Sequence, residues 1–121
     1  MRQQVAKVFW RGSNTGTMPN RDKLPPEKIR KLHRNRLVAW ARAQNSSLYD
    51  IAFSGAYHIG EPFGDISVEV NGGALAEKVG GQSAYQFKYL LVIDGNGQAG
   101  RTFWYLCSSS VVFLVEGMSE W

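Results

Sequence analysis

One cysteine, Cys107, is present among the 121 residues, so no disulfide can form within the chain. Histidine is almost as rare, and His58 has no second histidine, cysteine or paired carboxylate at the spacing of metal ligands. No apolar run approaches the length of a membrane span, and the residues from Met1 to Gln4 do not begin a signal peptide. The sequence has two glycine-rich stretches, at residues 11–16 and 94–97, and neither carries the Lys-Ser/Thr pair of a P-loop. These absences exclude a disulfide scaffold and a membrane-spanning segment in this sequence, argue against a metal site, and leave the redox compartment open.

Basic residues are unevenly distributed along the chain. The formal net charge is +4, but the segment from Arg21 to Arg42 carries +6 and the rest of the chain carries −2. Such local basicity indicates an anionic ligand for one element. An apolar content of 44% with 12% aromatic residues is ordinary for a globular domain, and the length suffices for one hydrophobic core. The cationic residues of the segment are Arg21, Lys23, Lys28, Arg30, Lys31, Arg34, Arg36 and Arg42, against Asp22 and Glu27.

The segment from Lys88 to Val115 predicts a strand, a loop, a helix and a second strand in succession. The apolar run from Tyr89 to Ile93 has the length of a buried strand, and it stops at the turn-forming sequence Asp94-Gly95-Asn96-Gly97. The run from Arg101 to Ser109 predicts a short helix, and the β-branched run from Val111 to Val115 predicts the next strand. The serines at 108–110 are expected to cap the helix and to form the turn, because no histidine partner marks them as nucleophiles.

A second loop of the same kind follows the first predicted strand, Gln4 to Trp10. This loop reads Arg11-Gly12-Ser13-Asn14-Thr15-Gly16. If the two strands are parallel neighbours, both loops open on one edge of the sheet, where loop amides and helix N-termini bind anions. Arg101 would add a guanidinium to that edge. The alternatives are two unrelated turns on opposite edges and a solvated Arg101 in a surface turn.

Between these two units the pattern predicts a helix and two further strands. Pro25 and Pro26 suit a helix start, and the helix is expected to run to Gln44 with a basic face opposite its apolar stripe. Leu48 to Phe53 predicts a strand. The apolar stripe is formed by Ile29, Leu32, Leu37, Val38, Trp40 and Ala41.

The segment that follows has a weaker pattern. Ile66, Val68 and Val70 alternate strictly with other residues, which predicts a strand or a hairpin arm. The glycine pairs at 72–73 and 80–81 bracket a weak helix, and the residues at 82–87 lead into the main strand.

Four short blocks, the last of them in two parts, together point to a family. Residues 9–16 read FWRGSNTG, residues 33–38 read HRNRLV, and residues 87–97 read FKYLLVIDGNG and are followed by Gly100-Arg101. Residues 108–112 read SSSVV, and the chain closes on Glu120-Trp121. In this order the blocks resemble the W-R-G-S-x-T, R-x-R-L-V, K-Y-L-x-x-x-D-G-x-G, S-x-S-V-V and E-W motifs of glycosyltransferase family 90. That family holds the protein O-glucosyltransferases and the fungal capsule-associated xylosyltransferase-like proteins, and the blocks span nearly the whole chain.

The resemblance implies a fold and a reaction. The fold is α/β, a Rossmann-like half of a GT-B glycosyltransferase with a mostly parallel sheet and flanking helices. Residues 1–121 would form a single partial domain that binds the nucleotide sugar. The reaction is an inverting, metal-independent transfer from a UDP-sugar donor, UDP-glucose or UDP-xylose, to a hydroxyl of a protein or polysaccharide acceptor. No cofactor, nucleic-acid partner or membrane segment in this chain is implied. The family's location is the secretory pathway, in the ER or Golgi lumen, with or without a membrane anchor in the full-length protein.

The resemblance also implies site residues. Arg34 and Arg101 match the two arginines that hold the UDP diphosphate, while Arg36 could equally shape the site. A diphosphate leaving group develops negative charge, and two guanidinium groups with loop amides can stabilise that charge without a metal. The remaining predicted site residues are Gly12, Ser13 and Thr15 in the first loop, and Asp94 and Gly95 in the second.

The chain departs from the family pattern in two ways. Ala99 stands where the family has serine, which removes a hydroxyl from the second loop. The family's general base lies upstream of the matched blocks, so the catalytic residue is expected outside this chain, and the chain is expected to bind nucleotide as a fragment. Two other readings stay open: a non-enzymatic module that binds nucleic acid or another polyanion through the basic helix 26–44, and a truncated product whose exposed sheet edge prevents a stable fold.

Overall fold

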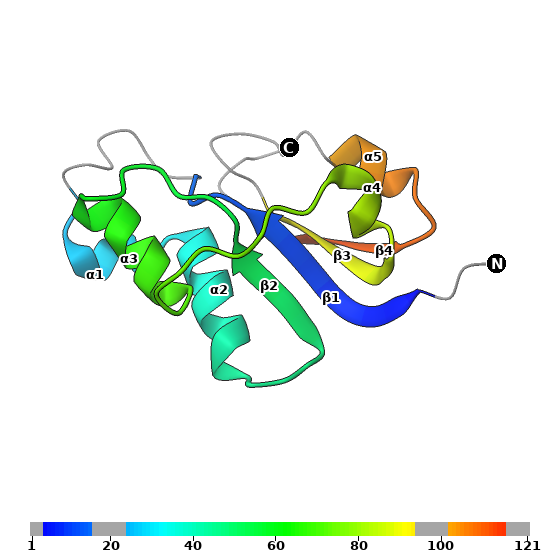
Figure 1. Ribbon diagram of the computed structural model, residues 1–121, viewed down its shortest axis with the longest axis horizontal. Helices are drawn as coiled ribbons and strands as arrows, with labels where there is room; N and C mark the ends of the chain where they lie inside the picture. Colours follow the sequence, from blue (N-terminus) through cyan, green and yellow to red (C-terminus); the bar gives the residue numbers. More distant parts are fainter. Residues whose placement is uncertain (1–3, 16–23, 94–101, 116–121) are drawn as a thin grey trace.

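The computed structural model describes residues 4–15, 24–93 and 102–115, and in this part of the chain one parallel sheet forms the centre (Figure 1). The strand order is β2-β1-β3-β4, and every pairing is parallel. The sheet with its flanking helices confirms the α/β prediction and has a small Rossmann-like arrangement. The strands are β1 (Val5–Gly12), β2 (Tyr49–Phe53), β3 (Phe87–Ile93) and β4 (Val111–Val115).

Alternate residues of the buried strands divide the core into two layers. Trp10 of β1 packs on one side of the sheet with Val38 and Ala41 of α2 (His33–Ala43), and Phe9 packs on the other side with Ala84 and Tyr105. The helices on the Trp10 side are α2, α1 (Pro26–Ile29) and α3 (Pro62–Val70), and those on the Phe9 side are α4 (Gly81–Ala84) and α5 (Thr102–Leu106).

The predicted helix from Pro26 to Gln44 is interrupted, so this prediction is wrong in part. α1 ends at Ile29, and Leu32, immediately before α2, is extended with ψ of 147°. The Asn35 side chain donates from Nδ2 to the Ile29 carbonyl at 2.8 Å, and the Ser67 hydroxyl of α3 donates to Asn35 Oδ1 at 2.8 Å. This buried polar link satisfies the end of α1 and fixes the break.

The predicted apolar stripe also fails at one position. α2 buries Arg34, Asn35, Val38 and Ala41, whereas Trp40 is 49% exposed. The helix therefore turns two polar side chains inward, and hydrophobicity alone could not predict that orientation.

The strand predicted at Ile66, Val68 and Val70 is wrong, because these residues lie in α3. Pro62 occupies the first helical turn, and the Asp65 side chain accepts a hydrogen bond from the Gly60 amide at 2.8 Å. Phe63, Ile66, Ser67 and Val70 recur at helical spacing, and the first three are buried against α1 and α2. Helical packing of this stripe overrides the β-propensity of the valines.

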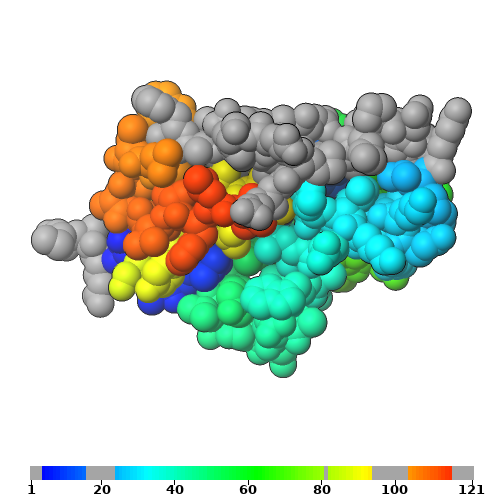
Figure 2. Space-filling model, turned by 180° about the vertical axis from the view of Figure 1, so that it is seen from behind, coloured from blue at the N-terminus to red at the C-terminus, as the bar shows by residue number. Residues whose placement is uncertain are grey.

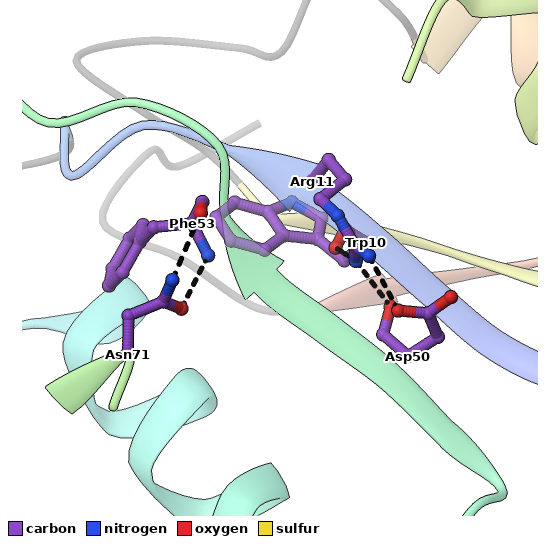
Figure 3. A network of polar contacts seen from close by, with 5 residues as sticks. All are labelled: Trp10, Arg11, Asp50, Phe53 and Asn71. Carbon is purple, nitrogen blue, oxygen red and sulfur yellow. Dashed lines mark hydrogen bonds and ion pairs between the residues drawn. The ribbon is translucent and has the colours of Figure 1, made fainter. Parts of the chain in front are cut away.

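The weak helix expected between the two glycine pairs is also absent from residues 74–80, which the structure describes without helix. The Ala76 amide donates instead to the Phe53 carbonyl at 2.9 Å, at the end of β2. Asn71 bonds the same backbone: its Oδ1 accepts from the Phe53 amide at 2.8 Å, and its Nδ2 donates to the Phe53 carbonyl at 3.1 Å (Figure 3). Its Nδ2 also donates to the Ala74 carbonyl at 2.7 Å. The side chain of Asn71 thus acts as a strand partner for Phe53.

Substitution of Asn71 by alanine is expected to lower the free energy of unfolding by about 2 kcal/mol, because the buried Phe53 amide loses its acceptor. Urea unfolding followed by circular dichroism measures the change. Gln44→Ala, which removes an exposed amide bonded to the Trp40 carbonyl, is the matched control and should stay within about 0.5 kcal/mol of the parent. Equal losses in the two variants would show that Asn71 does not hold the end of β2.

The two strands and the helix predicted for the C-terminal part are confirmed, whereas the loop predicted between the first strand and the helix lies outside the described residues. β3 and β4 flank α5 and pair in parallel, with Leu91 opposite Phe113. The serines have the predicted roles: the Ser108 hydroxyl donates to the Tyr105 carbonyl at 2.6 Å, and the Ser110 hydroxyl donates to the Phe87 carbonyl at 2.7 Å. These bonds turn the chain from α5 into β4.

Candidate functional site

The strand order creates a topological switch point between β1 and β3. The chain passes outward from β1 to β2 and then returns to the other side of β1 to form β3 and β4. In parallel α/β sheets, ligands bind beyond the carboxyl ends of the strands at such a point. β1 and β3 are parallel neighbours, so the condition under which both strands end on one edge of the sheet is met. Of the predicted site residues, Gly12, Ser13, Thr15 and Arg34 are described, whereas Asp94, Gly95 and Arg101 lie outside the described residues.

Arg34 joins the ends of these two strands. Its Nη1 donates to the Ser13 carbonyl at 2.9 Å and to the Thr15 hydroxyl at 3.1 Å, and its Nη2 donates to the Ile93 carbonyl at 2.8 Å. The side chain is buried, and its guanidinium lies 5.2 Å from the Trp10 ring centre. A cation in the first turn of α2 is disfavoured by the helix dipole, and the carbonyl acceptors offset that cost. In this structure Arg34 therefore fixes the loop after β1, and its predicted contact with a diphosphate stays a prediction.

A second link ties the loop after β1 to the loop after β2. The buried Asn14 side chain accepts from the Tyr57 amide at 2.8 Å and donates to the Tyr57 carbonyl at 3.3 Å. The Ser54 amide also donates to the Gly12 carbonyl at 2.9 Å. Together with Arg34, these bonds hold the carboxyl ends of three neighbouring strands in one arrangement, which is the preorganisation that a binding site needs.

Gly12 has a packing role that the sequence does not show. A Cβ at this position would lie 2.7 Å from Cζ2 of the Trp10 ring, so a larger residue would displace the indole. The glycine predicted to lie beside the nucleotide is thus also required by the core below the loop.

A cavity of about 440 Å³ opens at this edge, on the Phe9 side of the sheet. Its volume is in the range of small-molecule sites, about 300–1,000 Å³. The loops after β1 and β2 contribute small residues, the segment before α4 contributes Lys78 and Val79, and aromatic rings come from Tyr85, directly after α4, and from α5. No carboxylate is among the lining residues that the structure describes. They are Phe9, Arg11, Gly12, Ser13, Ser54, Gly55, Lys78, Val79, Tyr85, Trp104 and Tyr105.

Arg11 is held in the wall of this cavity by β2. Its Nη2 forms an ion pair with Asp50 Oδ1 at 2.6 Å, and its Nη1 donates to the carbonyls of Trp10 and Asp50, both at 3.0 Å (Figure 3). The guanidinium lies 5.1 Å from the Phe9 ring centre. A side chain with this many fixed contacts presents its charge in one orientation at little entropic cost.

The structure divides the predicted residues between two places. Gly12 and Ser13 line the cavity, whereas Arg34 and the Thr15 hydroxyl meet beneath the loop. Arg11 lies within the block that resembles W-R-G-S-x-T, so that motif could have identified it. Lys78, Tyr85 and the aromatic residues of α5 carry no sequence signal, because only the fold brings them to this edge.

The basic segment does not form one continuous cationic face. Arg34 is buried, and Arg30 pairs with Glu69 of α3 at 2.8 Å. The described cations left at the surface of the segment are Lys28, Lys31, Arg36 and Arg42, and Arg21 and Lys23 lie outside the described residues. The polyanion reading therefore relies on fewer side chains than the sequence suggests.

These features define a small parallel α/β domain with a cationic, aromatic cavity at its switch point. No protein-family model, curated protein or solved structure matches the chain. Among residues 4–15, 24–93 and 102–115, no group of histidine, cysteine, aspartate and glutamate is arranged for a metal ion, and no helix there is long and apolar enough to cross a membrane.

Proposed function

We propose that this chain binds the UDP moiety of a nucleotide sugar in the cavity at the ends of β1 and β2, as the donor-binding part of an inverting, metal-independent glycosyltransferase. The donor is UDP-glucose or UDP-xylose, and the acceptor is a hydroxyl of a protein or polysaccharide. The observation that carries the proposal is the cavity itself, where small loop residues, fixed cationic charge and aromatic rings meet at the switch point of a parallel sheet.

The lining of the cavity divides by chemistry. Tyr85, Trp104 and Tyr105 offer ring faces for a uracil base, and Trp104 is 63% exposed. Lys78 offers positive charge for phosphates beside Arg11, whose guanidinium is already paired with Asp50, and Gly12, Ser13 and Gly55 let the backbone approach the ligand closely. An anionic nucleotide with one flat apolar base fits this combination.

The proposed chemistry follows from the same groups. When the sugar departs to its acceptor, the UDP diphosphate gains negative charge, and fixed guanidinium and amide donors stabilise it. The family resemblance matches Arg34 and Arg101 to the two arginines that hold the diphosphate, and Arg101 is proposed to be one of these donors. The acceptor hydroxyl must lose a proton to a general base, and we assign that role to no residue of this sequence.

An amide NMR titration with UDP tests the proposal. Saturable shifts are expected at Ser13, Gly55, Lys78 and the Trp104 indole. Arg101→Ala should weaken UDP binding by about 1.5–3 kcal/mol, the scale of a charged hydrogen bond. Lys78→Ala should weaken it by about fivefold, the scale of a partly exposed ion pair.

Lys88→Ala is the matched control for Lys78→Ala, because Lys88 is exposed on β3 and does not line the cavity. Its UDP affinity should equal that of the parent. A dispersed spectrum that does not respond to UDP would contradict the proposal, and a salt-dependent response to DNA in the same sample would favour the polyanion reading.

A further inference from the structure

α2 presents two separate stripes to its surroundings. One stripe, described above, is buried on β1, β2 and α3. The second consists of His33, Arg36, Leu37 and Trp40, which recur at the i, i+3, i+4, i+7 spacing of one helix face. All four line a groove of about 540 Å³ together with Ile93 of β3 and Val115 of β4, and we call it the α2–β4 groove.

The apolar floor of the α2–β4 groove continues along β4. Val111, Phe113 and Val115 pair with Tyr89, Leu91 and Ile93, so they share the Trp10 side of the sheet. Val111 is 47% exposed and Phe113 is 49% exposed, and Figure 2 shows β4 (red) and α2 (cyan) open on the same face. A strand that is apolar on this face is typical of sheets covered by a helix.

The open space beside α2 suits one helix. On the Trp10 side, Leu91 and Ile93 of β3 are buried in the core, so the open strand is β4. Packed helices lie about 8–10 Å apart, so a helix laid along β4 would contact the open stripe of α2.

The rim of the groove selects the charge of the occupant. Arg30, His33 and Arg36 line it, and none of the described lining residues is acidic. Arg30 already pairs with Glu69, so Arg36 is the main cation toward the groove. The N-terminal end of α2 adds the positive end of the helix dipole beside His33. An occupant with carboxylates along the edge next to α2 would complement this field.

We propose that the α2–β4 groove binds an amphipathic α-helix of a partner protein, with an apolar stripe on β4 and Asp or Glu residues facing Arg36. This interface is independent of the nucleotide cavity, which lies on the opposite side of the sheet. The recognition mode is a helix in a hydrophobic groove, in which apolar anchors supply affinity and flanking charges supply orientation.

Three labelled helical peptides of about 18 residues test the proposal by fluorescence anisotropy. They share a leucine stripe at i, i+3, i+4 and i+7 and carry Glu, Gln or Lys at the flanks. The Glu peptide is expected to bind saturably and about fivefold more tightly than the Lys peptide, the scale of one exposed ion pair with Arg36. Arg36→Glu should reverse this order, and Phe113→Ser should weaken all three peptides about tenfold.

Lys31→Glu and Ile59→Ser are the matched controls, because both residues are exposed and neither lines the groove. They should leave all affinities unchanged, and circular dichroism should show the parent fold in every variant. The proposal is overturned if the Glu peptide shows no saturable binding, or if Arg36→Glu and Phe113→Ser leave its affinity unchanged.

Two other occupants give distinct results. A dimer of the parent chain in light scattering that becomes a monomer in Phe113→Ser would show that a second copy covers the groove. Oligonucleotide binding that displaces the Glu peptide and is lost in Arg36→Glu would show a polyanion surface. Either result overturns the partner-helix proposal.

Discussion

The Arg34→Ala variant is expected to lose about 2–5 kcal/mol of unfolding free energy, because each of the two strand-end carbonyls that loses its donor costs about 1–3 kcal/mol. Three hydrogen bonds disappear at once, and the carbonyls of Ser13 and Ile93 lose a charged donor at the edge of the sheet. Urea unfolding followed by tryptophan fluorescence measures the change. Arg34→Lys should recover only part of the loss, because one ammonium group cannot reproduce the planar fork that reaches both strand ends.

Arg36 provides the control, since it is an arginine of the same helix with an exposed side chain. Arg36→Ala should remain within about 0.5 kcal/mol of the parent. Equal stability of the Arg34→Ala and Arg36→Ala variants would contradict the structural role of Arg34. If Arg34→Ala keeps its stability but no longer binds UDP, the diphosphate contact implied by the resemblance would be the better account of this residue.

Truncation of Trp10 to alanine is expected to cost about 3–5 kcal/mol, the usual range for removing a buried large aromatic side chain. The indole is 1% exposed, meets the Phe53 ring edge to face at 5.8 Å between centres, and packs under the Arg34 guanidinium. Trp10→Phe should cost less, because it keeps a ring and removes the indole N–H, for which no described residue is an acceptor. Denaturant unfolding of the two variants gives the values.

Trp104→Ala is the matched control, because this tryptophan is 63% exposed, and the free energy of unfolding should change by no more than about 0.5 kcal/mol.

A double-mutant cycle of Gly12 and Trp10 adds a sharper test. Gly12→Ala should destabilise the parent by about 1–3 kcal/mol and the Trp10→Phe background by clearly less, because the Cβ collides with the part of the indole that phenylalanine lacks. Additive losses would show that Gly12 is not required by the Trp10 ring.

The sequence predicted the sheet better than the helices, for a physical reason. β3 and β4 are continuous apolar runs with turn residues beside them, and such a run predicts a strand of a parallel sheet regardless of its neighbours, although only β3 is buried on both faces. α3 was missed because Ile66, Val68 and Val70 alternate as in a strand while Phe63, Ile66 and Val70 also recur as in a helix. The break before α2 depends on a side-chain bond from Asn35 to Ile29, which no periodicity reveals.

The candidate site could be predicted only for residues close to the glycine-rich loop. Gly12 and Ser13 follow a strand directly, so local sequence places them at the edge of the sheet. Lys78 and Trp104 reach the same cavity through long connections, and their positions depend on the strand order. Arg34 was predicted to lie at this edge, but its three acceptors are backbone or hydroxyl groups of other elements that the sequence alone cannot bring together.

The hydrogen bond from Arg34 to Ile93 joins residues 59 positions apart, and the hydrogen bond from Arg34 to Ser13 joins residues 21 positions apart. The native shape of the loop after β1 therefore depends on the pairing of β3 with β1. Amide hydrogen exchange should reflect this dependence: the protected amides around the loop should exchange through the same opening event as the central strands, not through local fraying. A ligand bound at this edge would then stabilise the whole domain against unfolding, and any mutation that destabilises the sheet would weaken ligand binding.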